Sequence, residues 1–142
     1  MKEPITASEF ERRMAELCLG GFGPSMPRKQ RDRHILLKSM ALLLGHGREY
    51  SEPALNDVLQ AWVQAAGPRV LIDHVSLRRY LVEEGYVERD RAGHLYRVCA
   101  ADSKESLFDA GLEGIDPFRA VSEAIAEREQ RRRSHEGEGT SD

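Results

Sequence analysis

Residues 73–98 read DHVSLRRYLVEEGYVERDRAGHLYRV, and this stretch decides the fold. Its first part predicts a helix over Asp73–Glu84 that is closed by a glycine. Its second part predicts a β-hairpin with strands at Tyr86–Arg89 and His94–Val98 and a turn at Asp90–Gly93. A short basic helix followed by a basic hairpin is typical of the DNA-contacting end of a winged helix-turn-helix.

Three further helices are predicted upstream, where apolar residues recur at helical spacing. Their expected bounds are Ser8–Leu19, Pro27–Leu44 and Glu52–Ala65. Ser8 and Glu11 have the spacing of a capping box, Ser51 is a good N-cap for the third helix, and Asp73 is the expected cap of the helix that precedes the hairpin. A short strand at Tyr50 is expected before that helix. Helix, helix, helix and hairpin follow one another over residues 27–98, which is the order of a winged helix.

The chain after Val98 is predicted to be a loop over residues 99–115 and then a helix that begins at Asp116-Pro117. The fold class expected from these patterns is mostly α with a small β-hairpin, a winged helix-turn-helix with additional N- and C-terminal helices. The expected parts are an N-terminal helix and linker (1–26), the winged helix-turn-helix domain (27–98), a C-terminal loop and helix (99–133) and a disordered tail (134–142).

The charge is distributed unevenly, although the whole chain carries only −3. Residues 28–98 carry a net charge of +3, and residues 99–142 carry −5. This asymmetry suits a DNA-binding core with an acidic appendage, although +3 is also common on ordinary protein surfaces.

No apolar run approaches the roughly 20 residues needed to cross a bilayer. The N-terminus lacks the apolar block of a secretory signal peptide, so a cytoplasmic location without membrane attachment is expected. Cys18 and Cys99 lie far apart in sequence and have no ligand spacing, and we expect them to be reduced and structural.

The predicted helix Asp73–Glu84 should turn Leu77 and Leu81 toward the core. Ser76 and Arg79 then point outward and Arg78 points sideways, so all three are candidate DNA contacts. The alternative for Arg79 is a solvated charge paired with a glutamate one turn along.

Six more basic residues complete the candidate site. Arg89, Arg91 and Arg97 belong to the hairpin, where a basic wing can lie on the phosphate backbone or probe a minor groove. Arg28, Lys29 and Arg31 begin the second helix and could hold phosphates. Charged hairpin tips and helix ends are also ordinary solubility features, and that alternative stays open for both groups.

Catalysis has little support in the sequence, and the chain is not expected to be an enzyme or to carry a cofactor. It contains no glycine-rich phosphate loop, no HExxH and no CxxC motif. A metal site assembled in space from His34, His46 or a cysteine is a remote alternative, because these residues have no ligand spacing.

Two apolar stripes lie outside the minimal winged helix: Phe10, Met14 and Leu17 near the N-terminus, and Phe118, Val121 and Ile125 near the C-terminus. An apolar stripe must be buried somewhere. The stripes either pack on the back of the domain or form the two-fold interface of a homodimer, as helix-turn-helix regulators commonly do.

With these residues described, the segment Pro27–Val98 resembles the bacterial domain of unknown function 2087 family. The resemblance rests on PRKQRDRHILL at residues 27–37, GREYSE at residues 47–52 and DHVSLRRYLVEEGYVERDRAG at residues 73–93. Family members are commonly labelled winged-helix transcriptional regulators, so the resemblance implies a winged-helix fold and, by analogy, a role on DNA.

The sequence therefore predicts a sequence-specific DNA-binding transcriptional regulator whose partner is double-stranded DNA. The alternative is a protein-interaction adaptor that uses the same scaffold without binding DNA. In that case the exposed Val75 and Val82 beside Arg79 would form the patch that contacts the partner.

Overall fold

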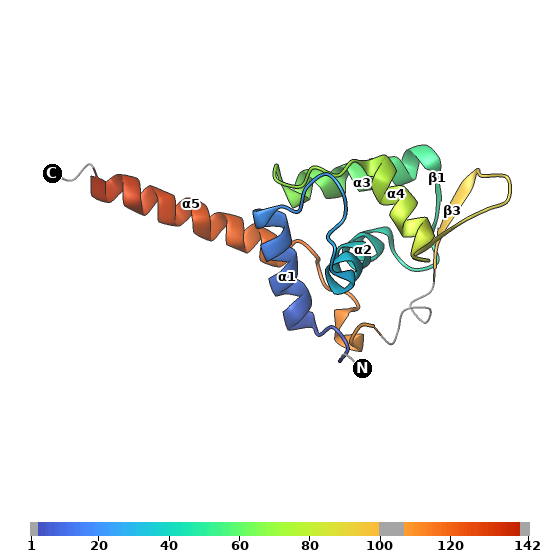
Figure 1. The fold of residues 1–142 in the computed structure, drawn as a ribbon, viewed down its shortest axis with the longest axis horizontal. Coiled ribbons are helices and arrows are strands. Elements are labelled where there is room, and N and C mark those ends of the chain that lie inside the picture. The colour runs from blue at the N-terminus through green and yellow to red at the C-terminus, as the bar shows by residue number, and fades with distance from the viewer. Residues whose placement is uncertain (1–2, 100–106, 140–142) are drawn as a thin grey trace.

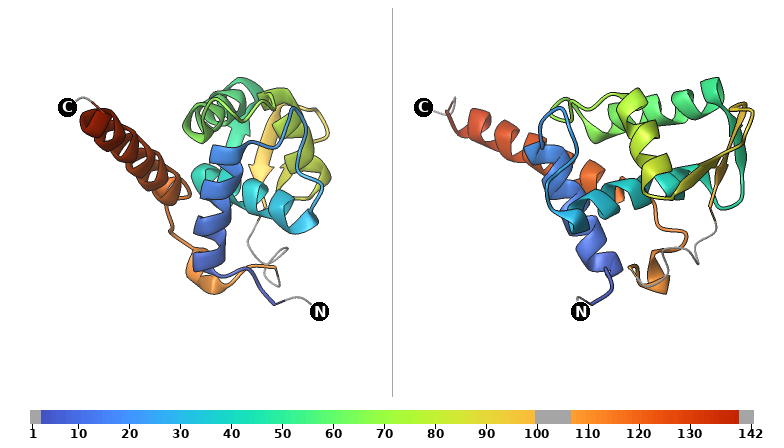
Figure 2. Two further views of the ribbon diagram at one scale, coloured as in Figure 1. Left: turned by 60° about the vertical axis from the view of Figure 1, so that its left-hand side comes forward. Right: turned by 45° about the vertical axis from the view of Figure 1, so that its right-hand side comes forward.

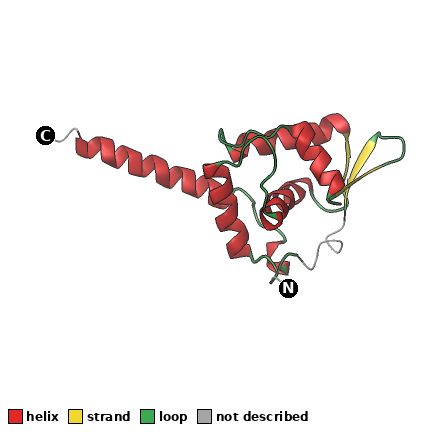
Figure 3. Cartoon of the chain, viewed as in Figure 1, coloured by secondary structure: helices red, strands yellow, loops and turns green. Residues whose placement is uncertain are grey.

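The computed structural model describes residues 3–99 and 107–139, with side chains as far as residue 135. Helices dominate, and the small sheet lies at one end of the molecule (Figures 1 and 3). The elements in chain order are α1 (Ala7–Gly20), α2 (Gln30–Leu44), β1 (Glu49–Ser51), α3 (Glu52–Ala66), α4 (His74–Glu83), β2 (Val87–Arg89), β3 (Leu95–Val98), the short 3-10 helix η2 (Ala110–Leu112) and α5 (Arg119–Gly139). The expected loop over 99–115 and the expected tail lie partly outside the described residues.

The sheet has three antiparallel strands in the order β1-β3-β2, so the hairpin predicted from the sequence gains the expected short strand at Tyr50. Tyr50 and Arg89 are the Cα partners of Tyr96 in the centre of β3. Because side chains alternate along a strand, Tyr96 and Val98 are buried and Arg97 is exposed on the opposite face. The fold class expected from the sequence is confirmed: five α-helices with a small three-stranded sheet among the described residues, compatible with a winged-helix-like arrangement.

One hydrophobic core joins α2, α3, α4 and the sheet. Leu77 and Leu81 are fully buried, as predicted, so α4 packs on α3 through that face. Trp62 on α3 is also fully buried, and its indole N–H donates to the Ser39 hydroxyl of α2 at 2.8 Å. This hydrogen bond satisfies the indole N–H of Trp62 and links α3 to α2 at a defined point.

The two terminal helices pack within the chain. Figure 2 shows α2 beginning beside α1 and running toward the sheet, and α1 also packs against the first turns of α5. Phe10, Met14 and Val121 are buried, and the ring of Phe118 lies 6.0 Å from that of Trp62. The apolar stripes therefore pack on the protein's own core, with only Ile125 half-buried, and the homodimer stays a prediction.

Several helix boundaries differ from the sequence prediction. Thr6, rather than Ser8, caps α1, because its hydroxyl accepts the backbone N–H of Glu9. Helix α2 begins at Gln30 rather than Pro27, because Lys29 has the extended backbone of an N-cap residue, with φ −68° and ψ 123°.

Helix α5 begins at Arg119 rather than Asp116-Pro117, and it extends to Gly139. Residues 134–139, which the sequence predicts to be disordered, are helical in the structure. Residues 126–136 contain no proline, glycine or β-branched residue and so oppose helix formation little. A Glu127–Arg131 pair at 3.7 Å, one turn apart, adds support.

Candidate nucleic-acid interface

A groove of about 380 Å³ lies between α4, the start of α3 and the β2–β3 hairpin. Arg78 and Arg79 line it from α4, and Arg89 lines it from β2. Residues from the predicted helix and the predicted hairpin thus meet at one surface, as the sequence pattern indicated. The other six candidate residues do not line this groove.

Helix α4 exposes one face to solvent, because its other face is buried in the core. Asp73 caps the helix, as predicted, and its carboxylate accepts the backbone N–H of Ser76 at 2.7 Å. This hydrogen bond lowers the pKa of Asp73, so the cap stays ionised at neutral pH. Opposite Leu77 and Leu81, the side chain of Arg79 is 62% exposed, and no terminal segment among the described residues covers it.

Arg78 is held by the protein itself. Its guanidinium donates to Asn56 at 2.6 Å and lies 3.1 Å from the Glu52 carboxylate, both on α3. Only 19% of its side chain is exposed. Arg78 therefore ties α4 to α3, and the sequence prediction that it is a free DNA contact is not supported by this geometry.

The Arg79 side chain, in contrast, makes only weak, exposed contacts. It lies 3.6 Å from the exposed Glu83 one turn along, the pairing named above as its alternative role, and 5.3 Å from the ring of Tyr80. An exposed pair of this kind is worth only a few tenths of a kcal/mol, so a phosphate or a base could displace it. Ser76 is less free, because its hydroxyl also interacts with the Asp73 cap.

The hairpin turn brings Arg89 toward α4. Gly93 has φ +73°, a backbone conformation that favours glycine, and the Arg89 guanidinium crosses the turn directly beside it, 2.7 Å from where a Cβ would lie. The guanidinium then lies 5.7 Å from the ring of Tyr96. Asp90 closes the turn, and hydrogen bonds from the backbone lower its pKa. Arg91 follows at the tip of the hairpin, where its side chain is exposed.

Arg97 lies on the other face of the sheet. Its Cα partners are Glu49 on β1 and Glu88 on β2, so two acids flank it there. The hairpin arginines predicted to act together are thus divided between two faces, with Arg89 on the α4 side and Arg97 on the outer side.

The basic start of α2 is also separate from the groove. Arg31 forms a two-pronged pair with Glu9 of α1, at 2.5 and 2.6 Å, and its guanidinium also donates to the Glu3 carbonyl. Arg28 and Lys29 are exposed on the approach to the helix. Arg31 therefore anchors α1 to α2, a structural role that the sequence prediction missed.

Sequence reasoning also missed Glu52, which lines the groove and pairs with Arg78. Its position in the first turn of α3, where acids are favoured by the helix dipole, was the only available signal. Tyr96 and two exposed valines complete the groove wall, with Val75 51% and Val82 36% exposed. The groove is therefore mixed in character: cationic, acidic and apolar groups lie side by side.

The described residues offer no group of three or more His, Cys, Asp or Glu side chains that could hold a metal ion. His34 lies 2.9 Å from the Tyr86 hydroxyl through Nδ1, while His46 contacts Glu113 at 3.0 Å. Both cysteines are thiols, and burial raises the pKa of Cys18 to about 12. None of the helices in the described ranges is long and apolar enough to span a membrane.

The fold and the groove define a small, mostly helical protein with a three-stranded antiparallel sheet and a partly basic helix-and-hairpin surface. Residues 24–98, more than half of the chain, match the family described as uncharacterized protein conserved in bacteria, DUF2087. The chain belongs to this family, which confirms the resemblance seen in its sequence. No curated protein and no solved structure matches it.

Proposed function

We propose that the chain is a sequence-specific DNA-binding transcriptional regulator, with α4 in the major groove and the β2–β3 hairpin acting as a wing on the backbone. One observation carries the proposal. The solvent-facing side of α4, which bears Arg79, continues across the groove to Arg89 and on to Arg91 at the hairpin tip. Arginine suits both tasks, since its planar guanidinium pairs with guanine edges and with phosphates.

In this proposal Arg79 is the base-reading candidate, and Arg89 and Arg91 hold phosphates. Arg78 is the residue that positions α4 on α3 and leaves the list of direct contacts. The two acids of the groove, Glu52 and Glu83, oppose non-specific attraction of DNA, so affinity must come from a fitted site rather than from charge alone.

Selection of bound duplexes from a random pool, followed by fluorescence anisotropy on the enriched sequence, tests the proposal. We expect enrichment of a defined sequence and an affinity that falls steeply with salt. Arg79→Ala should cost about 1–3 kcal/mol of binding free energy and relax selectivity at one position. Arg89→Ala should weaken binding to all duplexes and lower the salt slope by about 1.

The matched control is Arg97→Ala, since it removes the same charge from the same hairpin but from the outer face. Its affinity should stay close to that of the wild type. A pool without enrichment, or an equal loss in the Arg89 and Arg97 variants, contradicts the proposal.

A second candidate function is a protein-interaction adaptor, and the exposed Val75 and Val82 favour it. Apolar side chains next to acids and arginines are typical of a polar-rimmed protein interface. The adaptor predicts no salt-dependent duplex binding, so the same titration separates the two functions.

A further inference from the structure

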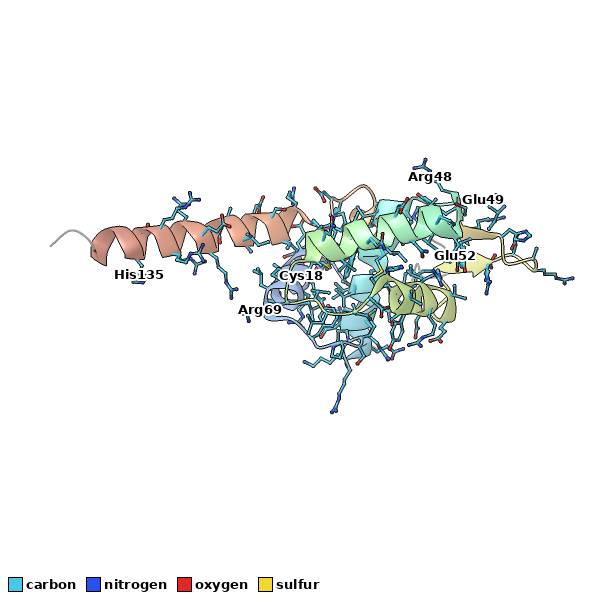
Figure 4. The ribbon with its side chains drawn as sticks, turned by 90° about the horizontal axis from the view of Figure 1, so that it is seen from above. Cys18, Arg48, Glu49, Glu52, Arg69 and His135 are labelled. Carbon is cyan, nitrogen blue, oxygen red and sulfur yellow. The ribbon has the colours of Figure 1, made fainter. Side chains whose placement is uncertain are left out.

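A second hollow lies at the end of the molecule from which α5 projects. Figure 4 places Cys18 and Arg69 at this end, while Arg48, Glu49 and Glu52 lie at the opposite end beside the sheet. The hollow encloses about 490 Å³ between the last turn of α1, the segment after α3 and the middle of α5. Such a volume is in the range of small-molecule sites, roughly 300–1,000 Å³.

The floor of this pocket is apolar. Cys18 is 2% exposed and Ala66 is 1% exposed, and Leu19 and Ile125 form the walls. Because burial raises the pKa of the Cys18 thiol to about 12, the sulfur is neutral at physiological pH and puts no negative charge on the floor.

Charge gathers at the mouth of the pocket. Arg69, Arg128 and Arg132 line it together with one acid, Glu129, which leaves an excess of positive charge. None of their guanidinium groups forms a hydrogen bond or an ion pair with the residues that the structure describes. Unpaired guanidinium groups above an apolar floor are complementary to an anion with an apolar body.

The face of α5 explains how the arginines reach the pocket. Val121 is buried against the core and Ile125 is half-buried one turn later. The same face continues at helical spacing to Arg128 and Arg132, so the stripe changes from apolar to cationic where the helix leaves the body. Arg131, on another face, is paired with a glutamate one turn back.

Arg69 is held in place through its backbone. A Cβ on Gly21, at the end of α1, would lie 2.7 Å from the carbonyl oxygen of Arg69, so the two segments touch without any intervening side chain. The bridge between Gly23 and Val70 fixes the next residue as well. A cation on an immobilised backbone loses less entropy on binding a ligand than one on a free loop.

An alternative, structural explanation for the arginines is that they stabilise the C-termini of α1 and α3, because cations are favourable at helix C-termini. A purely structural role would place guanidinium N–H groups on the open carbonyls of those last turns. No such hydrogen bond exists among the described side chains. The arginines instead surround a hollow.

We propose that this pocket binds a small organic acid, with its carboxylate among Arg69, Arg128 and Arg132 and its aliphatic or aromatic body on the apolar floor. Guanidinium groups pair with carboxylates through two parallel hydrogen bonds, which gives this class of ligand its selectivity over neutral analogues. The site lies away from the helix-and-hairpin groove and does not depend on the proposed role on DNA.

Calorimetric titration of the whole chain with octanoate and with 4-phenylbutyrate tests the proposal, and the corresponding alcohols serve as neutral counterparts. We expect saturable binding of at least one acid with one site per chain, and binding of its alcohol at least about tenfold weaker. Arg128→Gln should raise the Kd of that acid about tenfold or more, because one charge-assisted hydrogen bond is lost.

Arg133→Gln is the matched control, since Arg133 is exposed on the same helix and does not line the pocket. It should leave the Kd unchanged, and circular dichroism should show that both variants keep the wild-type helix content. Amide NMR shifts should concentrate around Gly67 and Arg69 rather than at the hairpin. Failure of both acids to bind saturably, equal affinity for acid and alcohol, or equal losses in the two variants overturns the proposal.

Discussion

Replacing Ser39 with alanine should destabilise the protein by stranding the indole of Trp62. The Trp62 side chain is fully buried, and its Nε1–H donates to the Ser39 hydroxyl at 2.8 Å. That hydroxyl in turn donates to the Leu36 carbonyl. In Ser39→Ala the fully buried indole N–H loses this partner, and a buried donor left unsatisfied costs about 1–3 kcal/mol. The Leu36 carbonyl keeps its helical hydrogen bond, so the loss falls mainly on the indole.

Urea unfolding followed by tryptophan fluorescence measures this cost, because the chain contains one tryptophan and the whole signal comes from Trp62. The midpoint should fall while the slope stays constant, which is the signature of changed stability with unchanged surface exposure. The cost of Ser39→Ala should shrink well below 1 kcal/mol in a Trp62→Phe background, measured by circular dichroism, because phenylalanine has no N–H to strand. Wild-type stability in Ser39→Ala, or an equal cost in both backgrounds, refutes the reasoning.

Three other perturbations address the caps, the turns and the ion pairs. Because the pKa of Asp73 is lowered, its carboxylate stabilises α4 fully at pH values above the ordinary pKa of 3.8, and this stabilisation is lost as the pH falls through the lowered pKa. Asp73→Asn should therefore make the free energy of unfolding less dependent on pH in the acid range. Gly21→Ala should cost at least about 1 kcal/mol more than Gly23→Ala in urea unfolding, since both have positive φ but only Gly21 faces a backbone oxygen at 2.7 Å. Arg13→Met should cost about 2–4 kcal/mol by stranding the buried Asp32 carboxylate, and Arg13→Met/Asp32→Leu should recover most of that loss of melting stability.

The helices and the hairpin could be predicted because their signals are local. An N-cap needs only a side chain and the backbone three residues on, and both Ser51 and Asp73 behave as predicted. Thr6 was missed because a competing pattern, Ser8 with Glu11, lies two residues later. The end of α5 was missed because a polar helix has no apolar period to read.

The candidate site was harder to predict, because long-range ion pairs leave no trace in sequence spacing. Arg78 and Arg31 each bond to a residue 22 positions away, and nothing local distinguishes them from the exposed Arg79. Arg97 could have been separated from Arg89 by the alternation of β3, since its buried neighbours Tyr96 and Val98 force it to the outer face. The alternation of side chains between the two faces of a strand was therefore enough to predict that Arg97 lies on the outer face.

The projecting part of α5 has a practical consequence for handling the protein. At about 1.5 Å per residue, the helix over Arg119–Gly139 is about 30 Å long, and its exposed second half points away from the sheet (Figure 1). A biotin or dye coupled through a cysteine placed at His135 would therefore sit on a natural spacer, remote from the hairpin (Figure 4). Immobilised by that spacer on a sensor chip, the molecule would turn its hairpin end toward the flowing solution.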